Sequence, residues 1–196
     1  MLLEQIWLRS RYEDNAENDM KKNFNLPNLL TILRILAVPF CAYALFKNGG
    51  DETSWQLIAW TGFFVVGLTD FFDGRIARSR KQITSLGTFL DPVADKIAIG
   101  TAMVGLSLLG KLWWVVTIII LGREIAVTIL RLLVIKDGVI PASKGGKLKT
   151  LFQGFGIGFY ILPLPSYLHL PRDLFMAVAV LLTLTSGFDY FKKALK

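Results

Sequence analysis

The sequence of 196 residues has a single cysteine and no cleavable leader pattern. Cys41 cannot form an intrachain disulfide, and its position in an apolar run favours a packing role. The first residues contain no short apolar core followed by a small-residue cleavage site, so we expect no signal peptide. Acidic residues are also scarce beside Lys and Arg, at 15 against 22, which leaves a net charge of +7.

Hydrophobic residues, in contrast, are abundant. They make up 53% of the chain and the mean hydropathy is +0.50, which predicts a polytopic membrane protein rather than a soluble core. In such a protein the basic excess reflects membrane topology and anionic lipid headgroups, so we expect no nucleic-acid partner. The length allows one domain and is too short for two sizeable ones.

Six apolar runs are candidates for transmembrane helices, because about 20 apolar residues are needed to cross a bilayer. They cover residues 29–46, 55–72, 89–109, 112–134, 151–163 and 174–188. Residues 1–24 mix charges with apolar side chains, as in an amphipathic helix on the membrane surface or a partly ordered tail. We therefore expect an all-α integral membrane protein, with this N-terminal segment followed by a six-helix domain over residues 25–196.

The distribution of basic residues predicts the topology of these spans. If both ends of the chain lie inside, the outer loops contain only Lys47, Lys111 and Arg172 of the 22 Lys and Arg. The lone His169 also lies in an outer loop, and we assign it no function. The segment that joins the second and third spans is then cytoplasmic. In the fifth span, the spacing of Gly154 and Gly158 predicts a close helix contact.

Four aspartates lie in or beside this cytoplasmic segment. Asp70 and Asp73 are three residues apart, and Asp91 and Asp95 are four apart, so each pair shares one face of a helix. If the two helices turn these faces toward each other, four carboxylates converge and their repulsion requires compensation. Hard divalent cations prefer carboxylate oxygens, and four aspartates can supply ligands for two ions about 4 Å apart.

Small and basic residues accompany the aspartates. Gly74 and Gly87 would let a bulky ligand approach the backbone, and Arg78 could pair with a pyrophosphate. For single residues a structural interpretation is also open. Asp91-Pro92 has the form of a helix N-cap followed by proline at the first helical position, and the basic residues could be topology signals. That interpretation does not account for the set as a whole.

From Asp70 to Asp95 the sequence reads D-x2-D-G-x2-A-R-x8-G-x3-D-x3-D, and this pattern resembles the signature of the CDP-alcohol phosphatidyltransferases at every fixed position. The resemblance implies the six-helix CDP-alcohol phosphotransferase fold from about residue 25. It also implies a reaction in which a CDP-linked lipid donates its phosphatidyl group to an alcohol and CMP is released.

The resemblance further implies roles for individual residues. Two divalent cations, Mg²⁺ or Mn²⁺, would be held by Asp70, Asp73, Asp91 and Asp95. Asp95 would also be the general base for the acceptor hydroxyl. The residues expected to face the CDP group are Asn28, Thr31, Gly74, Ala77, Arg78 and Gly87.

Three more segments, residues 25–35, 122–131 and 143–150, resemble those of bacterial family members that form phosphatidylglycerophosphate from sn-glycerol 3-phosphate. A phosphorylated acceptor requires cations, and the candidates are Arg123, Arg131, Lys144, Lys147 and Lys149. Alternatively, these residues are interfacial charges and topology signals. Arg123 lies well inside an apolar run, where an arginine without a partner is costly, and this favours a functional role.

The resemblance thus implies CDP-diacylglycerol and glycerol 3-phosphate as substrates, in a bacterial inner membrane with the active site facing the cytoplasm. It permits a homodimer. Inositol phosphate, serine or phosphatidylglycerol are alternative acceptors within the family. Other classes are a non-catalytic scaffold and a divalent-cation transporter, but a transporter should have acidic residues near the bilayer midplane, whereas all four aspartates are predicted at one surface.

Overall fold

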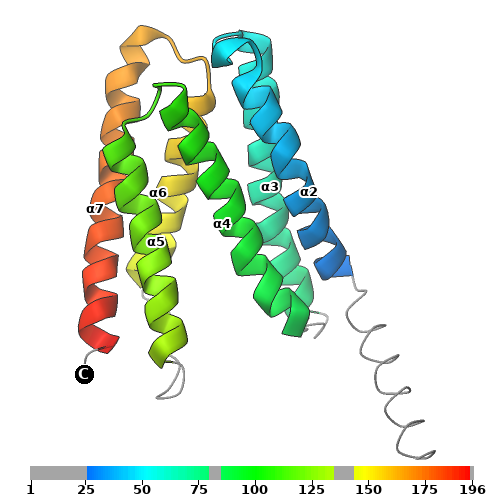
Figure 1. Cartoon of the computed structure of the whole chain (residues 1–196), viewed down its shortest axis with the longest axis vertical. Coiled ribbons are helices and arrows are strands. Elements are labelled where there is room, and N and C mark those ends of the chain that lie inside the picture. The colour runs from blue at the N-terminus through cyan, green and yellow to red at the C-terminus, as the bar shows by residue number, and fades with distance from the viewer. Residues whose placement is uncertain (1–25, 80–84, 135–143, 195–196) are drawn as a thin grey trace, which may run out of the picture. The chain divides into compact units, whose positions relative to one another are not determined.

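A computed structural model describes residues 26–79, 85–134 and 144–194, and at several helix ends it describes the backbone alone. Six long helices lie in these ranges: α2 (Leu26–Phe46), α3 (Thr53–Ser79), α4 (Ser85–Leu108), α5 (Trp114–Val134), α6 (Lys144–Ile161) and α7 (His169–Ala194). Two short 3-10 turns, η1 (Lys47–Gly50) and η3 (Ser166–Leu168), precede α3 and α7 (Figure 1). The prediction of an all-α fold is confirmed for these ranges, which contain no strand.

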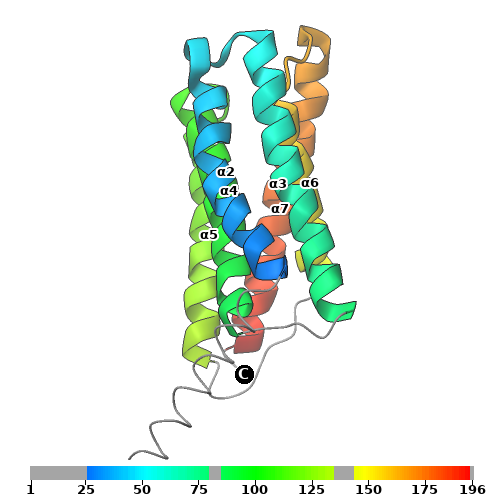
Figure 2. The ribbon, with the colours of Figure 1, turned by 90° about the vertical axis from the view of Figure 1, so that its right-hand side faces the viewer.

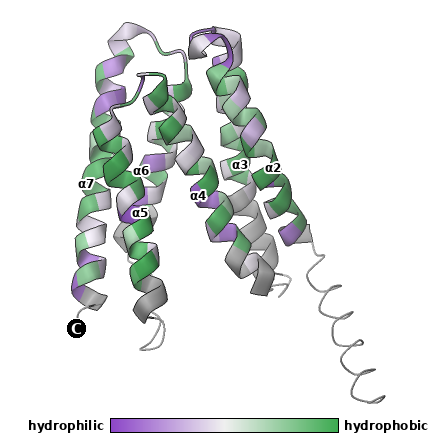
Figure 3. Ribbon diagram, in the orientation of Figure 1, coloured by the Kyte–Doolittle hydropathy of each residue, from purple (hydrophilic) through white to green (hydrophobic). Residues whose placement is uncertain are grey.

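Each of the six predicted apolar runs coincides with one of these helices. The helices extend beyond the runs where the sequence turns polar: α3 continues to Ser79 and α6 begins at Lys144. By length and composition, two segments of the described chain are able to cross a membrane, Asn28–Gly50 and Ser166–Lys192. Figure 3 shows α2 coloured hydrophobic along most of its length. Membrane crossing by all six helices stays a prediction, and the predicted surface segment 1–24 lies outside the described residues.

The helices divide between two compact units. The first comprises Met1–Pro39 and Val65–Ala98, and so takes the N-terminal part of α2, the C-terminal part of α3 and the N-terminal part of α4. The second comprises Phe40–Phe64 and Ile99–Lys196, including all of α5, α6 and α7. Both predicted aspartate pairs therefore belong to the first unit, and all the predicted acceptor-binding residues belong to the second.

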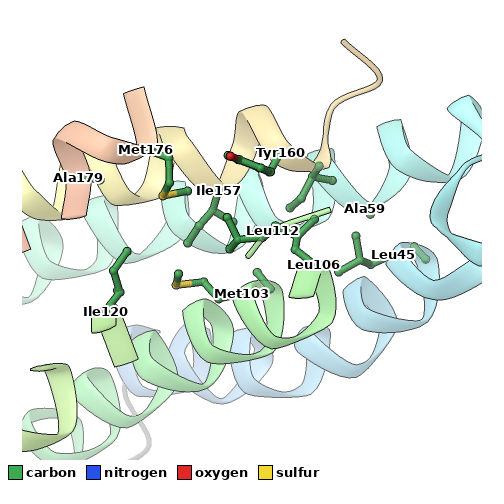
Figure 4. Close-up of a cluster of buried hydrophobic side chains, with 13 residues drawn as sticks. Leu45, Ala59, Met103, Leu106, Leu112, Ile120, Ile157, Tyr160, Met176 and Ala179 are labelled. Carbon is green, nitrogen blue, oxygen red and sulfur yellow. The ribbon is translucent and has the colours of Figure 1, made fainter. Parts of the chain in front are cut away.

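The second unit has a continuous apolar core. Helix α7 packs along α5 and α6 (Figure 1 and Figure 2). Buried side chains from several helices form one apolar cluster (Figure 4). It includes Met103 and Leu106 of α4, Ile120 of α5 and Met176 of α7. This packing fixes α5 and α6, which carry the basic residues discussed below, against α7.

Glycines permit close helix contacts in this unit, although not all of the predicted ones. A Cβ atom at Gly158 would lie 3.2 Å from Nε1 of Trp60, which confirms a close contact there. Gly154, in contrast, has no atom of the described residues within 4 Å of such a Cβ, and the close contact with α7 is made by Gly156, at 3.1 Å from Met176. The prediction for Gly154 is therefore wrong, because a glycine spacing does not reveal which face of a helix is packed.

Candidate functional site

Both predicted aspartate pairs lie on helices of the first compact unit. Asp70 and Asp73 belong to α3, and Asp91 and Asp95 belong to α4. The spacings of three and four residues therefore do place each pair on one helix face. The side chains of Asp91 and Asp95 are half-buried. Helix α3 also carries Gly74, Ala77 and Arg78, and the side chains of residues 70–79 lie outside the description.

Asp91 lies in the interior of α4 rather than at its start. The helix begins at Ser85, and Pro92 lies inside it, so the interpretation of Asp91-Pro92 as an N-cap with a following proline is wrong. A proline in this position cannot donate to the carbonyl four residues earlier, which weakens the helix. The Asp-Pro pair therefore does not serve to begin the helix, and the capping role no longer competes with a ligand role for Asp91.

Asp91 accepts a hydrogen bond from another helix. Oγ1 of Thr31, on α2, donates to Oδ1 of Asp91 over 2.7 Å, and the Thr31 side chain is fully buried. Asn28 is also buried on α2, and Gly87 is buried on α4. Three residues that are predicted to face CDP thus lie in the unit that holds the aspartates.

The donor set of this unit suits a hard divalent cation. Aspartate carboxylates are preferred ligands of Mg²⁺ and Mn²⁺, and Thr31 engages Asp91 through a neutral hydroxyl, which leaves the carboxylate its charge. The described side chains contain no group of three or more His, Cys, Asp or Glu placed to hold a metal, but Asp70 and Asp73 are not among them. The chemistry of the four predicted ligands therefore fits the expected ions.

A second polar cluster lies in the second unit, where α5, α6 and α7 meet. Arg123 donates from Nη1 to Oε1 of Glu124 at 3.2 Å and from Nη2 to Oγ of Ser186 at 3.1 Å. Lys149 forms an ion pair with the same Glu124 oxygen, and only 4% of Lys149 is exposed. Two of the predicted acceptor-binding cations thus share one carboxylate. Arg131, Lys144 and Lys147 lie on the same helices, and their side chains are outside the description.

The path of Arg123 depends on a glycine of α7. A Cβ atom at Gly187 would lie 3.1 Å from Cγ of Arg123, so a larger residue would press on the arginine side chain. Two buried donors, Nε of Arg123 and Nε2 of Gln153, have no hydrogen-bond partner among the residues that the structure describes. Gln153 follows Lys149 by one turn on the same face of α6. Buried donors without partners are uncommon and are often satisfied by a ligand, an ion or water.

The partners of these cations are not predictable from the sequence alone. Glu124 had a local signal, since an acidic residue in an apolar run beside Arg123 needs a cation. Ser186 had none, because it is 63 residues away from Arg123 and its position depends on the packing of α7 against α5. Gln153 is likewise an isolated amide in a glycine-rich run.

Comparisons with known proteins identify what this chain is similar to. The family model of the CDP-alcohol phosphatidyltransferases matches residues 24–185. A Mycobacterium tuberculosis protein named probable phosphatidylglycerophosphate synthase is 50% identical over 172 residues, which cover 88% of this chain and 82% of that protein. Two further relatives are named CDP-diacylglycerol–glycerol-3-phosphate 3-phosphatidyltransferase. The Bacillus subtilis protein is 38% identical, over 87% of this chain and 95% of that protein. The Rickettsia felis protein is 34% identical, over 90% of this chain and 99% of that protein.

Removal of Glu124 should destabilise the protein, because it removes the carboxylate that pairs with buried Lys149 and with Arg123. We expect Glu124→Ala to lower the free energy of unfolding by about 2–3 kcal/mol, and the double variant with Lys149→Met to regain most of that loss. Denaturation of the purified protein in detergent measures both. The matched control is Asp189→Ala, an exposed acidic residue of α7, with an expected change below about 0.5 kcal/mol. If Glu124→Ala is as stable as this control, the ion pair has no structural role.

Proposed function

Because this chain belongs to the CDP-alcohol phosphatidyltransferase family, we propose that it transfers the phosphatidyl group of CDP-diacylglycerol to sn-glycerol 3-phosphate, giving phosphatidylglycerophosphate and CMP. The observation that carries the proposal is the presence of two neighbouring cations, half-buried Arg123 and buried Lys149, in a chain that is similar over most of its length to proteins named for this reaction. The family and the apolar helices together make this a membrane enzyme.

Asp70, Asp73, Asp91 and Asp95 are the proposed ligands of two divalent cations, Mg²⁺ or Mn²⁺. When bound, such ions supply positive charge that neutralises the donor diphosphate and the departing CMP phosphate. The protein contributes two helices that carry the carboxylates in pairs within one compact unit. The proposed CDP-facing residues belong to the same unit: Asn28, Thr31, Gly74, Ala77, Arg78 and Gly87.

Asp95 is the proposed general base. The acceptor hydroxyl oxygen forms a bond to the phosphatidyl phosphorus, the bond from that phosphorus to the CMP oxygen breaks, and CMP leaves with the electron pair. Asp95 accepts the hydroxyl proton. An aspartate that also binds a cation is a weak base, so proton transfer accompanies formation of the new bond rather than preceding it.

The acceptor phosphate is proposed to bind to the basic residues of the second unit: Arg123, Arg131, Lys144, Lys147 and Lys149. Glu124 supports this role because its Oε1 binds both Lys149 and Arg123, which brings these two cations together. The Nε–H group of Arg123 has no hydrogen-bond partner among the described residues, so it can donate to a phosphate oxygen. Serine and phosphatidylglycerol have no terminal phosphomonoester to match these cations, and the names of the relatives favour glycerol 3-phosphate over inositol phosphate.

The placement in the cell follows from the same reaction. We propose that residues 25–196 form the six-span catalytic domain in a bacterial inner membrane, with the active site at the cytoplasmic face. The donor tails then stay in lipid while the water-soluble acceptor and CMP exchange with the cytoplasm. A homodimer is compatible with this arrangement.

The acceptor assignment is tested by supplying CDP-diacylglycerol and Mg²⁺ or Mn²⁺ to the purified full-length protein with one candidate acceptor at a time. We expect CMP release with glycerol 3-phosphate and only background release with inositol phosphate, serine or phosphatidylglycerol. CMP release with inositol phosphate alone would overturn the acceptor, and no release with any acceptor would favour transport or a scaffold role.

Asp95→Asn should reduce CMP release by about 1,000-fold or more, because it removes the base and one cation ligand together. The thermal unfolding midpoint should stay close to that of the wild type, since Asn has nearly the same shape. Asp189→Asn on α7 is the matched control and should retain full activity. Wild-type turnover in Asp95→Asn would refute the catalytic assignment.

Arg123→Gln should raise the KM for glycerol 3-phosphate by about 10-fold or more, because a charge-assisted hydrogen bond to phosphate is lost. The KM for CDP-diacylglycerol should change less than about twofold. Arg172→Gln, in the ion pair with Asp173 on α7, is the control for loss of an arginine elsewhere in the unit. Equal increases in both KM values for Arg123→Gln would indicate a structural arginine.

A further inference from the structure

Three of the four buried residues that α2 contributes to the first compact unit are polar, although the helix as a whole is strongly apolar. Asn28, Thr31 and Arg34 recur at every third position and are at most 3% exposed. Leu29 and Leu33 on the other side are about half exposed, at 48% and 52%. Polar side chains that turn inward from an apolar helix are costly unless they are paired, and they commonly mark functional positions.

One pairing of this face is explicit. The Thr31 hydroxyl donates to Oδ1 of Asp91 over 2.7 Å, the usual distance of an O–H···O hydrogen bond. The two residues are 60 positions apart and come from α2 and α4. Thr31 is 0% exposed, so water does not compete for this hydroxyl. The hydrogen bond therefore restricts the rotation of the Asp91 carboxylate.

The position of Asp91 explains why such a donor must come from another helix. In the interior of α4 the backbone N–H groups are used within the helix, so they cannot orient a carboxylate as they do at an N-terminus. A lysine or arginine could orient it, but its charge would compete with a cation for the same oxygens. A buried hydroxyl fixes one oxygen and leaves the negative charge of the carboxylate in place.

We propose that Thr31 is a positioning residue that holds the Asp91 carboxylate ready to bind a divalent cation, before any nucleotide is present. This inference rests on the proposed function, in which Asp91 is a cation ligand. It assigns Thr31 a different task from the expected contact with CDP, because the hydroxyl proton is already donated to Asp91. Hydrogen bonds that orient a metal ligand typically contribute 10- to 100-fold in metal affinity.

Two substitutions of Thr31 separate its hydroxyl from its shape. Thr31→Val keeps the branched shape and removes the hydroxyl, whereas Thr31→Ser keeps the hydroxyl and removes the methyl group. The matched control is Thr183→Val, because Thr183 is also 0% exposed. Among the described residues its hydroxyl donates only to the carbonyl oxygen of Ala179 in the same helix. Thermal unfolding of each purified full-length variant in detergent establishes that it is folded.

The decisive measurement is the affinity for Mn²⁺ in the absence of CDP-diacylglycerol. Binding is measured by the decrease of the electron paramagnetic resonance signal of free Mn²⁺. We expect a Kd about 10-fold higher for Thr31→Val than for wild type, with Thr31→Ser and Thr183→Val within about twofold of wild type. If Thr31→Val binds Mn²⁺ with the Kd of the wild type, the inference is overturned. If in that case the KM for CDP-diacylglycerol rises, Thr31 contacts the nucleotide instead.

Two other outcomes are equally informative. If Thr31→Ser loses Mn²⁺ affinity while Thr31→Val keeps it, the shape of Thr31 matters and its hydroxyl does not, which overturns the inference. If the wild-type protein itself binds no Mn²⁺ at a saturable site, the two-cation mechanism fails and the inference fails with it. Saturable binding by the wild type with no effect of Thr31→Val, in contrast, leaves the proposed function intact and removes only the role of Thr31.

Discussion

A charged side chain in an apolar helix needs a partner. In this structure Asp91 has a hydrogen bond from Thr31, and Lys149 has an ion pair with Glu124. The two partners differ in a way that suits what each site would bind. A neutral hydroxyl leaves Asp91 negative, as a cation ligand must be. Lys149 and Arg123 share the carboxylate of Glu124, so these three described side chains together keep one positive charge, which suits an anion site.

The two compact units thus carry opposite chemistry. The first holds the acidic pairs on α3 and α4, and the second holds the basic residues on α5 and α6. The proposed reaction joins two substrates that would need these two kinds of site: a diphosphate donor that would bind through cations and an acceptor with a phosphate of its own. We therefore expect substitutions in the two units to have separate effects on the two substrates.

Much of the helical layout is predictable from the sequence, because long apolar runs specify helices through their composition. All six predicted runs coincide with helices, and the pairing of aspartates by helix face follows from spacing alone. Helix ends are less predictable: α6 begins in the polar segment at Lys144, and α4 begins before Asp91, so the apparent cap at Asp91-Pro92 is an interior position.

Partners across helices are the part that the sequence does not reveal. Glu124 binds a lysine 25 residues away, and Ser186 binds an arginine 63 residues away, so both depend on how α5, α6 and α7 pack. The same holds for glycines, since Gly156 makes the close contact with α7 and Gly154 makes none. Periodicity places a residue on a face, but only the tertiary structure shows what that face meets.

The packing of α2 against α3 in the second unit has a practical consequence. A Cβ atom at Gly62 would lie 2.7 Å from Sγ of Cys41, which is 6% exposed and is the only thiol in the chain. The neighbouring helix thus shields the native sulfur from bulky maleimides. Cysteines introduced one at a time between the helices would react without a native background, so membrane-impermeant reagents can map the side on which each loop emerges in an otherwise unaltered protein.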